Sequence, residues 1–288
     1  MDKVCKDWAQ WLKKTRFAYM DEAQKTQTLN WLIQLRDELL DLAEITSNQR
    51  VIDLGCGSGL LGFGVLERFR DNVEIIFSDK YKGCLDECQK LLDEMDINHN
   101  ASFLKCNITN IRQKSDSIDR ALTRSVLVHV IDKALAFEEI YRILKHKGIY
   151  VGFEPIISQN TRYYELLQSS EITNYYEFKE AEKEIMEDPQ DALVNFNYET
   201  LTDDLQTSGF INVKVRVETV TSSYKPFREG IKKWFITPPG PNQKTMKQRF
   251  MEYFDEEEVD LYIKEVQKAL SNKNITINSK TAFIKAVK

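Results

Sequence analysis

The sequence lacks long apolar runs and an excess of positive charge. No stretch of its 288 residues approaches the roughly 20 apolar residues that cross a membrane. The first residues, Met-Asp-Lys-Val-Cys-Lys, do not form the apolar segment of a signal peptide. The net charge of −5 gives no general attraction to nucleic acid. We therefore expect a cytoplasmic protein with neither a membrane nor a nucleic acid as its partner.

Cysteine and histidine are too scattered to predict a metal site. The five cysteines include no Cys-x-x-Cys pair, and their odd number favours free thiols in a reducing compartment. Cys84 and Cys88 lie four residues apart and could face one metal ion. Because leucines share their helical stripe, we interpret both as core residues, and we expect no metal.

Short apolar runs alternate with amphipathic patterns from residue 50 onward. The expected strands are residues 50–54, 73–78, 102–105, 118–123, 148–154 and 210–218. The expected helices between them are residues 59–70, 81–95, 132–145 and 198–208, each to within a few positions. Alternation of strand and helix predicts an α/β fold, with a doubly wound parallel sheet covered on both faces.

Two helical patterns precede this alternation and predict a lid. One has Trp8, Trp11, Leu12 and Thr15 on one face, and the other has Leu29, Leu32, Ile33, Leu39, Leu40 and Ala43. Cationic and aromatic residues lie between the two patterns, unlike a plain core helix. We expect residues 1–46 to form an N-terminal helical lid on a domain of residues 47–288.

Two further segments interrupt the alternation and predict helical cap insertions. Residues 155–197 are polar and rich in aromatic side chains. Residues 219–278 contain two amphipathic patterns, from Thr245 to Phe254 and from Glu256 to Leu270. The last residues, TAFIKAVK, predict a closing strand. Both insertions should lie over the carboxyl edge of the sheet and enclose a pocket there.

The segment VIDLGCGSGLLG, Val51 to Gly62, joins an expected strand to an expected helix through a glycine-rich turn. Such a turn lets backbone N–H groups approach a ligand. Residues 57–62 satisfy the G-x-G-x-x-G dinucleotide pattern, and Asp79 ends the next strand, where a ribose-binding acid belongs. Asp53, however, would repel a pyrophosphate, whereas it suits a cationic ligand.

Asp53-Leu54-Gly55-Cys56-Gly57-Ser58-Gly59 resembles the D-x-G-x-G-x-G motif of class I S-adenosylmethionine-dependent methyltransferases. Three further segments fit that family in order: IIFSDKY its second strand, FLKCNITNI its third strand and adenine-side turn, and DRALTRSVLVHVID with ALAFEEIYRILKHKGIYVGFEP its fourth and fifth strands. The resemblance covers residues 48–218. It implies a Rossmann-like seven-stranded sheet in the order 3-2-1-4-5-7-6, with the last strand antiparallel.

The resemblance also implies the cofactor, S-adenosylmethionine, and the product, S-adenosylhomocysteine. Asp79 would hold the ribose hydroxyls, and Asn107 stands where the family often has an acid beside adenine. The implied cofactor-binding residues are Tyr19, Asp53, Gly55, Gly57, Gly59, Asp79, Lys80, Asn107, Ile108 and Arg124. Tyr19 has a second interpretation as a packing residue of its helix.

The catalytic residues are less well defined. Thr123-Arg124-Ser125 ends the fourth strand without the N/D-P-P-Y/F motif and without the acid of metal-dependent catechol methyltransferases, which favours metal-independent transfer. His129 is a candidate base, with packing as the alternative. Glu154 either faces the acceptor or caps the following turn.

These observations predict methyl transfer to oxygen or nitrogen, less readily to carbon, of a small-molecule or peptide-derived metabolite. The resemblance is to enzymes of natural-product biosynthesis. Two other classes of function stay open: an NAD-dependent oxidoreductase, and a non-catalytic module that binds S-adenosylmethionine.

Overall fold

A computed structural model describes residues 20, 22–95, 100–241 and 243–288. Seven strands form one sheet in the order β3-β2-β1-β4-β5-β7-β6. β7 runs antiparallel to both its neighbours, and the other pairs are parallel. The predicted fold class is confirmed. The strands are β1 (Arg50–Leu54), β2 (Glu74–Asp79), β3 (Ala101–Lys105), β4 (Ile118–Arg124), β5 (Leu144–Pro155), β6 (Ile211–Tyr224) and β7 (Ile275–Val287).

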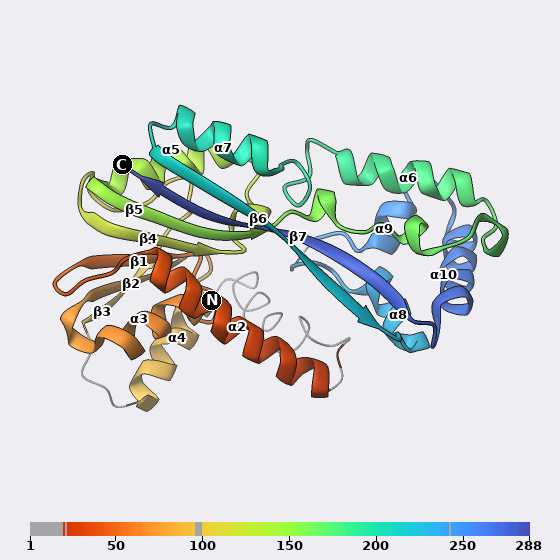
Figure 1. The fold of residues 1–288 in the computed structure, drawn as a ribbon, viewed down its shortest axis with the longest axis horizontal. Helices are drawn as coiled ribbons and strands as arrows, with labels where there is room; N and C mark the ends of the chain where they lie inside the picture. The colour runs from red at the N-terminus through yellow and green to blue at the C-terminus, as the bar shows by residue number, and fades with distance from the viewer. Residues whose placement is uncertain (1–19, 21, 96–99, 242) are drawn as a thin grey trace.

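Helices cover both faces of this sheet, as Figure 1 shows. One apolar core joins the strands to α2 (Glu22–Leu42), α3 (Leu60–Phe69) and α4 (Lys82–Met95). A second core, on the other face, includes α5 (Lys133–Ile143) and α7 (Tyr198–Thr207). A central strand that is buried on both faces needs apolar residues on both, which explains the run Ile75-Ile76-Phe77 of β2 and the apolar residues on either side of Asp53 in β1.

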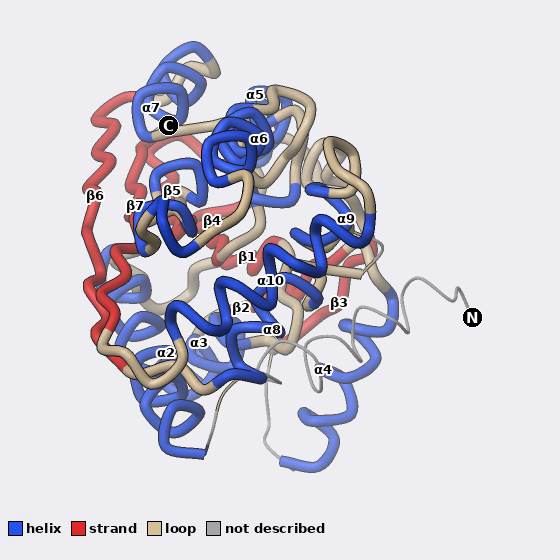
Figure 2. Tube along the Cα trace, turned by 90° about the vertical axis from the view of Figure 1, so that its right-hand side faces the viewer, coloured by secondary structure: helices blue, strands red, loops and turns tan. Residues whose placement is uncertain are grey.

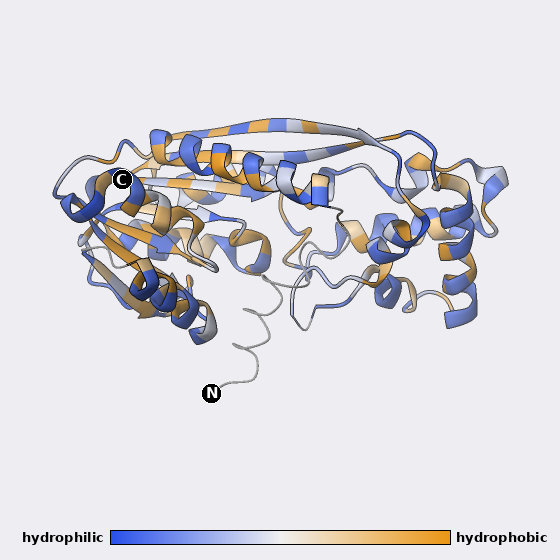
Figure 3. Cartoon of the chain, turned by 90° about the horizontal axis from the view of Figure 1, so that it is seen from below, coloured by the Kyte–Doolittle hydropathy of each residue, from blue (hydrophilic) through white to orange (hydrophobic). Residues whose placement is uncertain are grey.

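β6 and β7 continue past the sheet as a two-stranded ribbon that carries a cap (Figures 1 and 3). The cap has its own apolar core, and Figure 2 views the molecule from this side. Its helices are α6 (Tyr175–Glu187), α8 (Arg228–Ile236), α9 (Met246–Phe250) and α10 (Glu256–Leu270). The expected boundary at residue 218 is too early, because pairing with β7 extends β6 to Tyr224.

The second half of α2 corrects part of the lid prediction. Its buried residues are Leu32, Leu35, Leu39 and Leu40, with Ala43 just after the helix. Leu29 and Ile33, which we expected on the same face, are 55% and 47% exposed. Ion pairs Arg36–Glu67 and Arg68–Asp41 join the helix to α3. From Leu32 onward, α2 is therefore a core element rather than a lid.

The first predicted helical segment, with Trp8 and Trp11, lies outside the described residues. In the part of the chain that the structure describes, no helix is both long enough and apolar enough to cross a membrane.

Candidate functional site

The glycine-rich loop after β1 has a backbone that other residues cannot adopt without strain. Gly55, Gly57 and Gly59 have positive φ angles of 68°, 53° and 81°. A Cβ atom added to Gly55 would lie 2.6 Å from Cγ2 of Val126, and one added to Gly59 would lie 2.5 Å from Cε2 of Phe63. Glycine at these positions therefore permits the positive φ angles and the close approach of Val126 and Phe63 to the loop.

Asp53 holds this loop to the first turn of α3. The N–H of Gly62 donates to its Oδ2 (N···O 2.9 Å), and the side chain is 2% exposed. Burial raises the pKa of Asp53 to about 7, although the Gly62 N–H and the charge of Arg124 oppose the rise. Asp53 thus has a structural role in the loop, and it also lines a large cavity beside it.

Asp79 holds the other side of the loop. The N–H of Gly57 donates to Oδ2 (3.0 Å) and the N–H of Tyr81 donates to Oδ1 (2.9 Å). The side chain is 5% exposed, and burial raises its pKa. Asp79 lines a cavity of about 340 Å³ together with Lys80, Asn107 and Ile108. The structure therefore brings these predicted residues together at the carboxyl edge of the sheet.

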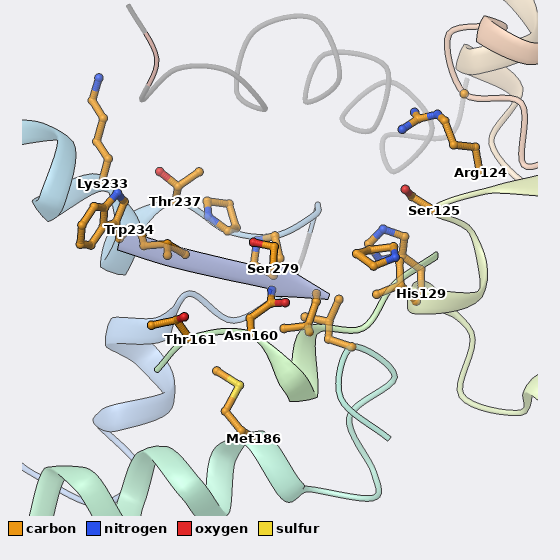
Figure 4. A pocket seen from close by; sticks show the side chains of 18 of the residues that line it. Arg124, Ser125, His129, Asn160, Thr161, Met186, Lys233, Trp234, Thr237 and Ser279 are labelled. Carbon is orange, nitrogen blue, oxygen red and sulfur yellow. The ribbon is translucent and has the colours of Figure 1, made fainter. Parts of the chain in front are cut away.

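A second cavity, of about 660 Å³, extends from the glycine-rich loop into the cap. The two cavities share Gly55, Ser125 and His129 in their walls. Ser125 has a φ of 54°, the kind of backbone strain that gathers at functional sites. Figure 4 shows Ser125 and His129 on one side of the larger cavity and Trp234 on the other. His129 therefore lies where the two cavities meet.

A profile of the methyltransferase-domain family matches residues 45–190, just over half of the chain. The chain belongs to this family. The match includes the glycine-rich loop, Asp79, His129 and α6.

Individual relatives of this methyltransferase-family chain are distant. The ubiquinone/menaquinone biosynthesis C-methyltransferase UbiE of Rickettsia prowazekii (strain Madrid E) is 25% identical over 155 residues, which are 50% of this chain and 61% of the relative. The sterol 24-C-methyltransferase erg6 of Aspergillus fumigatus is 24% identical over 110 residues, 38% of this chain and 29% of the relative. The chain thus spans less than two thirds of the length of either.

Solved structures show the fold of the methyltransferase family. The phosphoethanolamine N-methyltransferase 2 of Haemonchus contortus, in complex with phosphomonomethylethanolamine and S-adenosylhomocysteine, has a TM-score of 0.53 and 19% identity. That likeness covers 88% of this chain and 52% of the other. The YcgJ protein of Bacillus subtilis has a TM-score of 0.57 and 16% identity, over 90% of this chain and 98% of the other. These likenesses confirm the class I methyltransferase fold.

Glu154 does not face the acceptor side of the methyltransferase site. It is fully buried, and its carboxylate accepts from the N–H groups of Val126, Leu127 and Val128 at 3.0, 3.0 and 3.1 Å. Burial raises its pKa to about 7. A catalytic role does not fit this position, because both oxygens hold the turn that carries His129. Both interpretations of Glu154 are therefore corrected: it caps a turn, but the turn is the one after β4 (residues 126–128) and not the one that follows Glu154 in the chain.

The other residues singled out from the sequence are Arg124, Tyr19, Cys84 and Cys88. Arg124 lines the larger cavity, whereas Tyr19 lies outside the described residues. Cys84 and Cys88 are buried, as a core interpretation requires. Among the residues with described positions, no group of three or more His, Cys, Asp or Glu side chains could hold a metal ion.

Sequence reasoning missed the residues that the cap contributes to the methyltransferase cavity. Tyr163, Glu182, Met186, Tyr224 and Trp234 all line it. The aromatic richness of residues 155–197 was a signal for Tyr163, but nothing local distinguished Glu182 from its acidic neighbours. Gln243, in the loop between α8 and α9, was also missed; its Nε2 lies 3.4 Å from Nδ1 of His129.

Proposed function

We propose that this chain is an S-adenosylmethionine-dependent methyltransferase that acts without a metal on a small-molecule or peptide-derived acceptor. The observation that carries the proposal is the junction of two cavities at Gly55, Ser125 and His129. One cavity has the residues expected around an adenosine, and the other leads into the cap. A methyl donor in the first would meet an acceptor in the second at this junction.

The residues that line the two cavities fit S-adenosylmethionine. Gly55, Gly57 and Asp53 line the larger cavity, and Gly55 lines the smaller one as well, so these three residues would hold the amino-acid end where the cavities meet. Asp79 and Lys80 would hold the ribose, and the turn at Asn107 would hold the adenine. When bound, S-adenosylmethionine supplies a methyl group activated by its sulfonium.

The chain's own contribution is chiefly orientation. Aligning two reactants in an enclosed site can supply much of the acceleration of a displacement reaction. The cap forms one wall of the larger cavity, and Glu154 fixes the turn that carries His129. We propose that His129 accepts the acceptor's proton where the acceptor needs deprotonation. Its position at the junction supports this role.

The acceptor atom is not identified by the relatives, whose names include a carbon and a nitrogen methyltransferase. The volume of the larger cavity, about 660 Å³, supports a small or medium-sized acceptor, and we propose methylation on oxygen or nitrogen and less readily on carbon. We place this activity in the cytoplasm, in natural-product biosynthesis.

Methyl transfer is tested with the purified chain, methyl-labelled S-adenosylmethionine and a cell extract as the source of acceptors. We expect label in a small molecule, and we expect His129→Gln to lower kcat by a factor of roughly 10²–10⁴ without changing S-adenosylhomocysteine affinity. The exposed His146 provides the control variant, His146→Gln. Binding of NAD in place of S-adenosylhomocysteine would favour an oxidoreductase, and binding without label transfer would favour a non-catalytic module. Full turnover by His129→Gln would leave His129 a packing residue.

We also propose that the segment before Leu32 acts as the lid. The apolar Leu29, which is 55% exposed, supports this role; Trp31, at 38% exposure, also contacts Phe153 of β5 in a T-shaped arrangement of the two rings. Hydrogen exchange in residues 22–31 should slow on addition of S-adenosylhomocysteine by more than exchange in β3. Equal protection with and without the ligand would make this segment a fixed packing element.

A further inference from the structure

Glu182 is a buried carboxylate in the wall of the acceptor cavity. It lies on α6 and is 1% exposed. The N–H of Tyr163 donates to its Oε1 (2.8 Å), and the N–H of Tyr164 donates to its Oε2 (3.3 Å). Within the described parts of the chain, no cationic side chain lies within ion-pair distance of it. A buried charge without an ion-pair partner is costly unless a ligand supplies the partner.

Glu154 provides an internal comparison. Both carboxylates cap a short 3-10 turn, and burial raises the pKa of both to about 7. Glu154 accepts three N–H groups and is not part of the cavity wall, whereas Glu182 accepts two and lines the cavity. Capping therefore accounts for Glu154, but it does not account for the placement of Glu182 beside the acceptor space.

The basic residues near Glu182 do not neutralise it at close range. Arg162 attracts it electrostatically, but its guanidinium donates to the carbonyl oxygens of Ile157 and Ser158. Lys233 lines the same cavity, and Figure 4 shows its side chain pointing away from Met186, which lies one helical turn after Glu182 on α6.

Aromatic rings line the same part of the cavity. Tyr163 and Trp234 lie nearly parallel, with ring centroids 6.1 Å apart and planes 7° apart. Tyr224, at the end of β6, also lines the cavity. Aromatic faces attract organic cations, and a carboxylate beside them adds direct charge complementarity.

We propose that Glu182 anchors a positively charged amine of the acceptor in the cap, while the atom to be methylated lies near His129. This inference rests on the proposed function, because it assigns the larger cavity to the acceptor. It makes the acceptor a bifunctional molecule, with a cationic amine at one end and the methylated atom at the other. The residue that selects a positively charged acceptor then lies on α6, and not among the residues of the proposed cofactor cavity.

The test uses three probes of similar shape and different charge: 2-phenylethylammonium, 2-phenylethanol and phenylacetate. Each is titrated by calorimetry into the full chain saturated with S-adenosylhomocysteine. We expect the ammonium probe to bind at least tenfold more tightly than the alcohol, and phenylacetate to bind most weakly. Glu182→Gln should remove the preference for the ammonium probe and leave alcohol binding within threefold. The control Glu180→Gln, at an exposed position of the same helix, should keep the preference.

The outcomes separate this inference from the proposed function. Failure of the wild-type chain to bind S-adenosylhomocysteine would contradict the proposed function itself. Three results would overturn the role of Glu182 and leave the proposed function standing, provided that the chain binds S-adenosylhomocysteine. These are no preference for the ammonium probe, a preference for phenylacetate, and no binding of any probe. If Glu182→Gln does not fold, Glu182→Asp replaces it, because aspartate keeps the charge on a shorter side chain. We expect Glu182→Asp to show a weaker but measurable preference for the ammonium probe. An unchanged preference, or no preference, would contradict the proposed role of Glu182.

Discussion

Replacing Asp79 by alanine is expected to lower the affinity for S-adenosylhomocysteine by about 10- to 100-fold. A hydrogen bond to a charged group contributes about 1.5–3 kcal/mol, which corresponds to roughly that range. The loss has a second source here, because Asp79 also holds the N–H groups of Gly57 and Tyr81 and so fixes the loop that faces the ligand. Calorimetric titration measures the change.

Asp93→Ala is the matched control for Asp79→Ala. Asp93 is exposed on α4, and its carboxylate accepts from Gln89 of the same helix. We expect this variant to bind like the wild type. Unchanged affinity in Asp79→Ala, in a protein with a wild-type melting temperature, would remove Asp79 from the cofactor site.

Replacing Lys133 by alanine is expected to destabilise the protein by about 3–5 kcal/mol, because it leaves several buried acceptors unpaired. Lys133 is 4% exposed, and burial lowers its pKa to about 8. Its ammonium donates to the carbonyl oxygens of Val130 and Ala192 and to Oδ1 of Asn195. It therefore joins the turn after His129 to the first cap insertion.

Urea unfolding of Lys133→Ala measures this loss. Lys90→Ala is the control, because Lys90 is exposed on α4 and pairs only with the exposed Glu94 among the described residues; we expect a change below about 0.5 kcal/mol. A loss below about 1 kcal/mol in Lys133→Ala would mean that water replaces the ammonium at these acceptors.

The sheet was predictable because its sequence signals are local. Ile75 to Phe77 are apolar on both faces of β2, Val51, Ile52 and Leu54 are the apolar residues of β1, and the glycines after β1 mark the turn. The order of the strands came from the resemblance rather than from any periodicity. A helical insertion was expected over residues 155–197, but the bounds of α6 within it depend on the packing of Phe178, Ala181 and Ile185 in the cap core and were not predicted.

The site residues that lie at the ends of strands were predictable from the sequence. Asp53, Asp79 and Asn107 come at or just after the carboxyl ends of parallel strands, which meet at one edge. Glu154 also ends a strand, but the direction of its side chain depends on the N–H groups of residues 126–128, which sequence does not reveal. Contacts from the cap, such as Gln243 beside His129, depend on tertiary packing alone.

The placement of β7 has a consequence for the order in which the protein is built. β7 follows every other strand in the chain, yet it pairs with both β5 and β6, and β6 has no other neighbour in the sheet. Before β7 is synthesised, β5 presents an unpaired edge, and Ile275 and Ile277 are missing from the cap core. β1, β2 and β4, which carry the cofactor edge, are already paired by then. The nascent chain can therefore pair the strands of the proposed cofactor edge before β7 completes the wall of the proposed acceptor cavity.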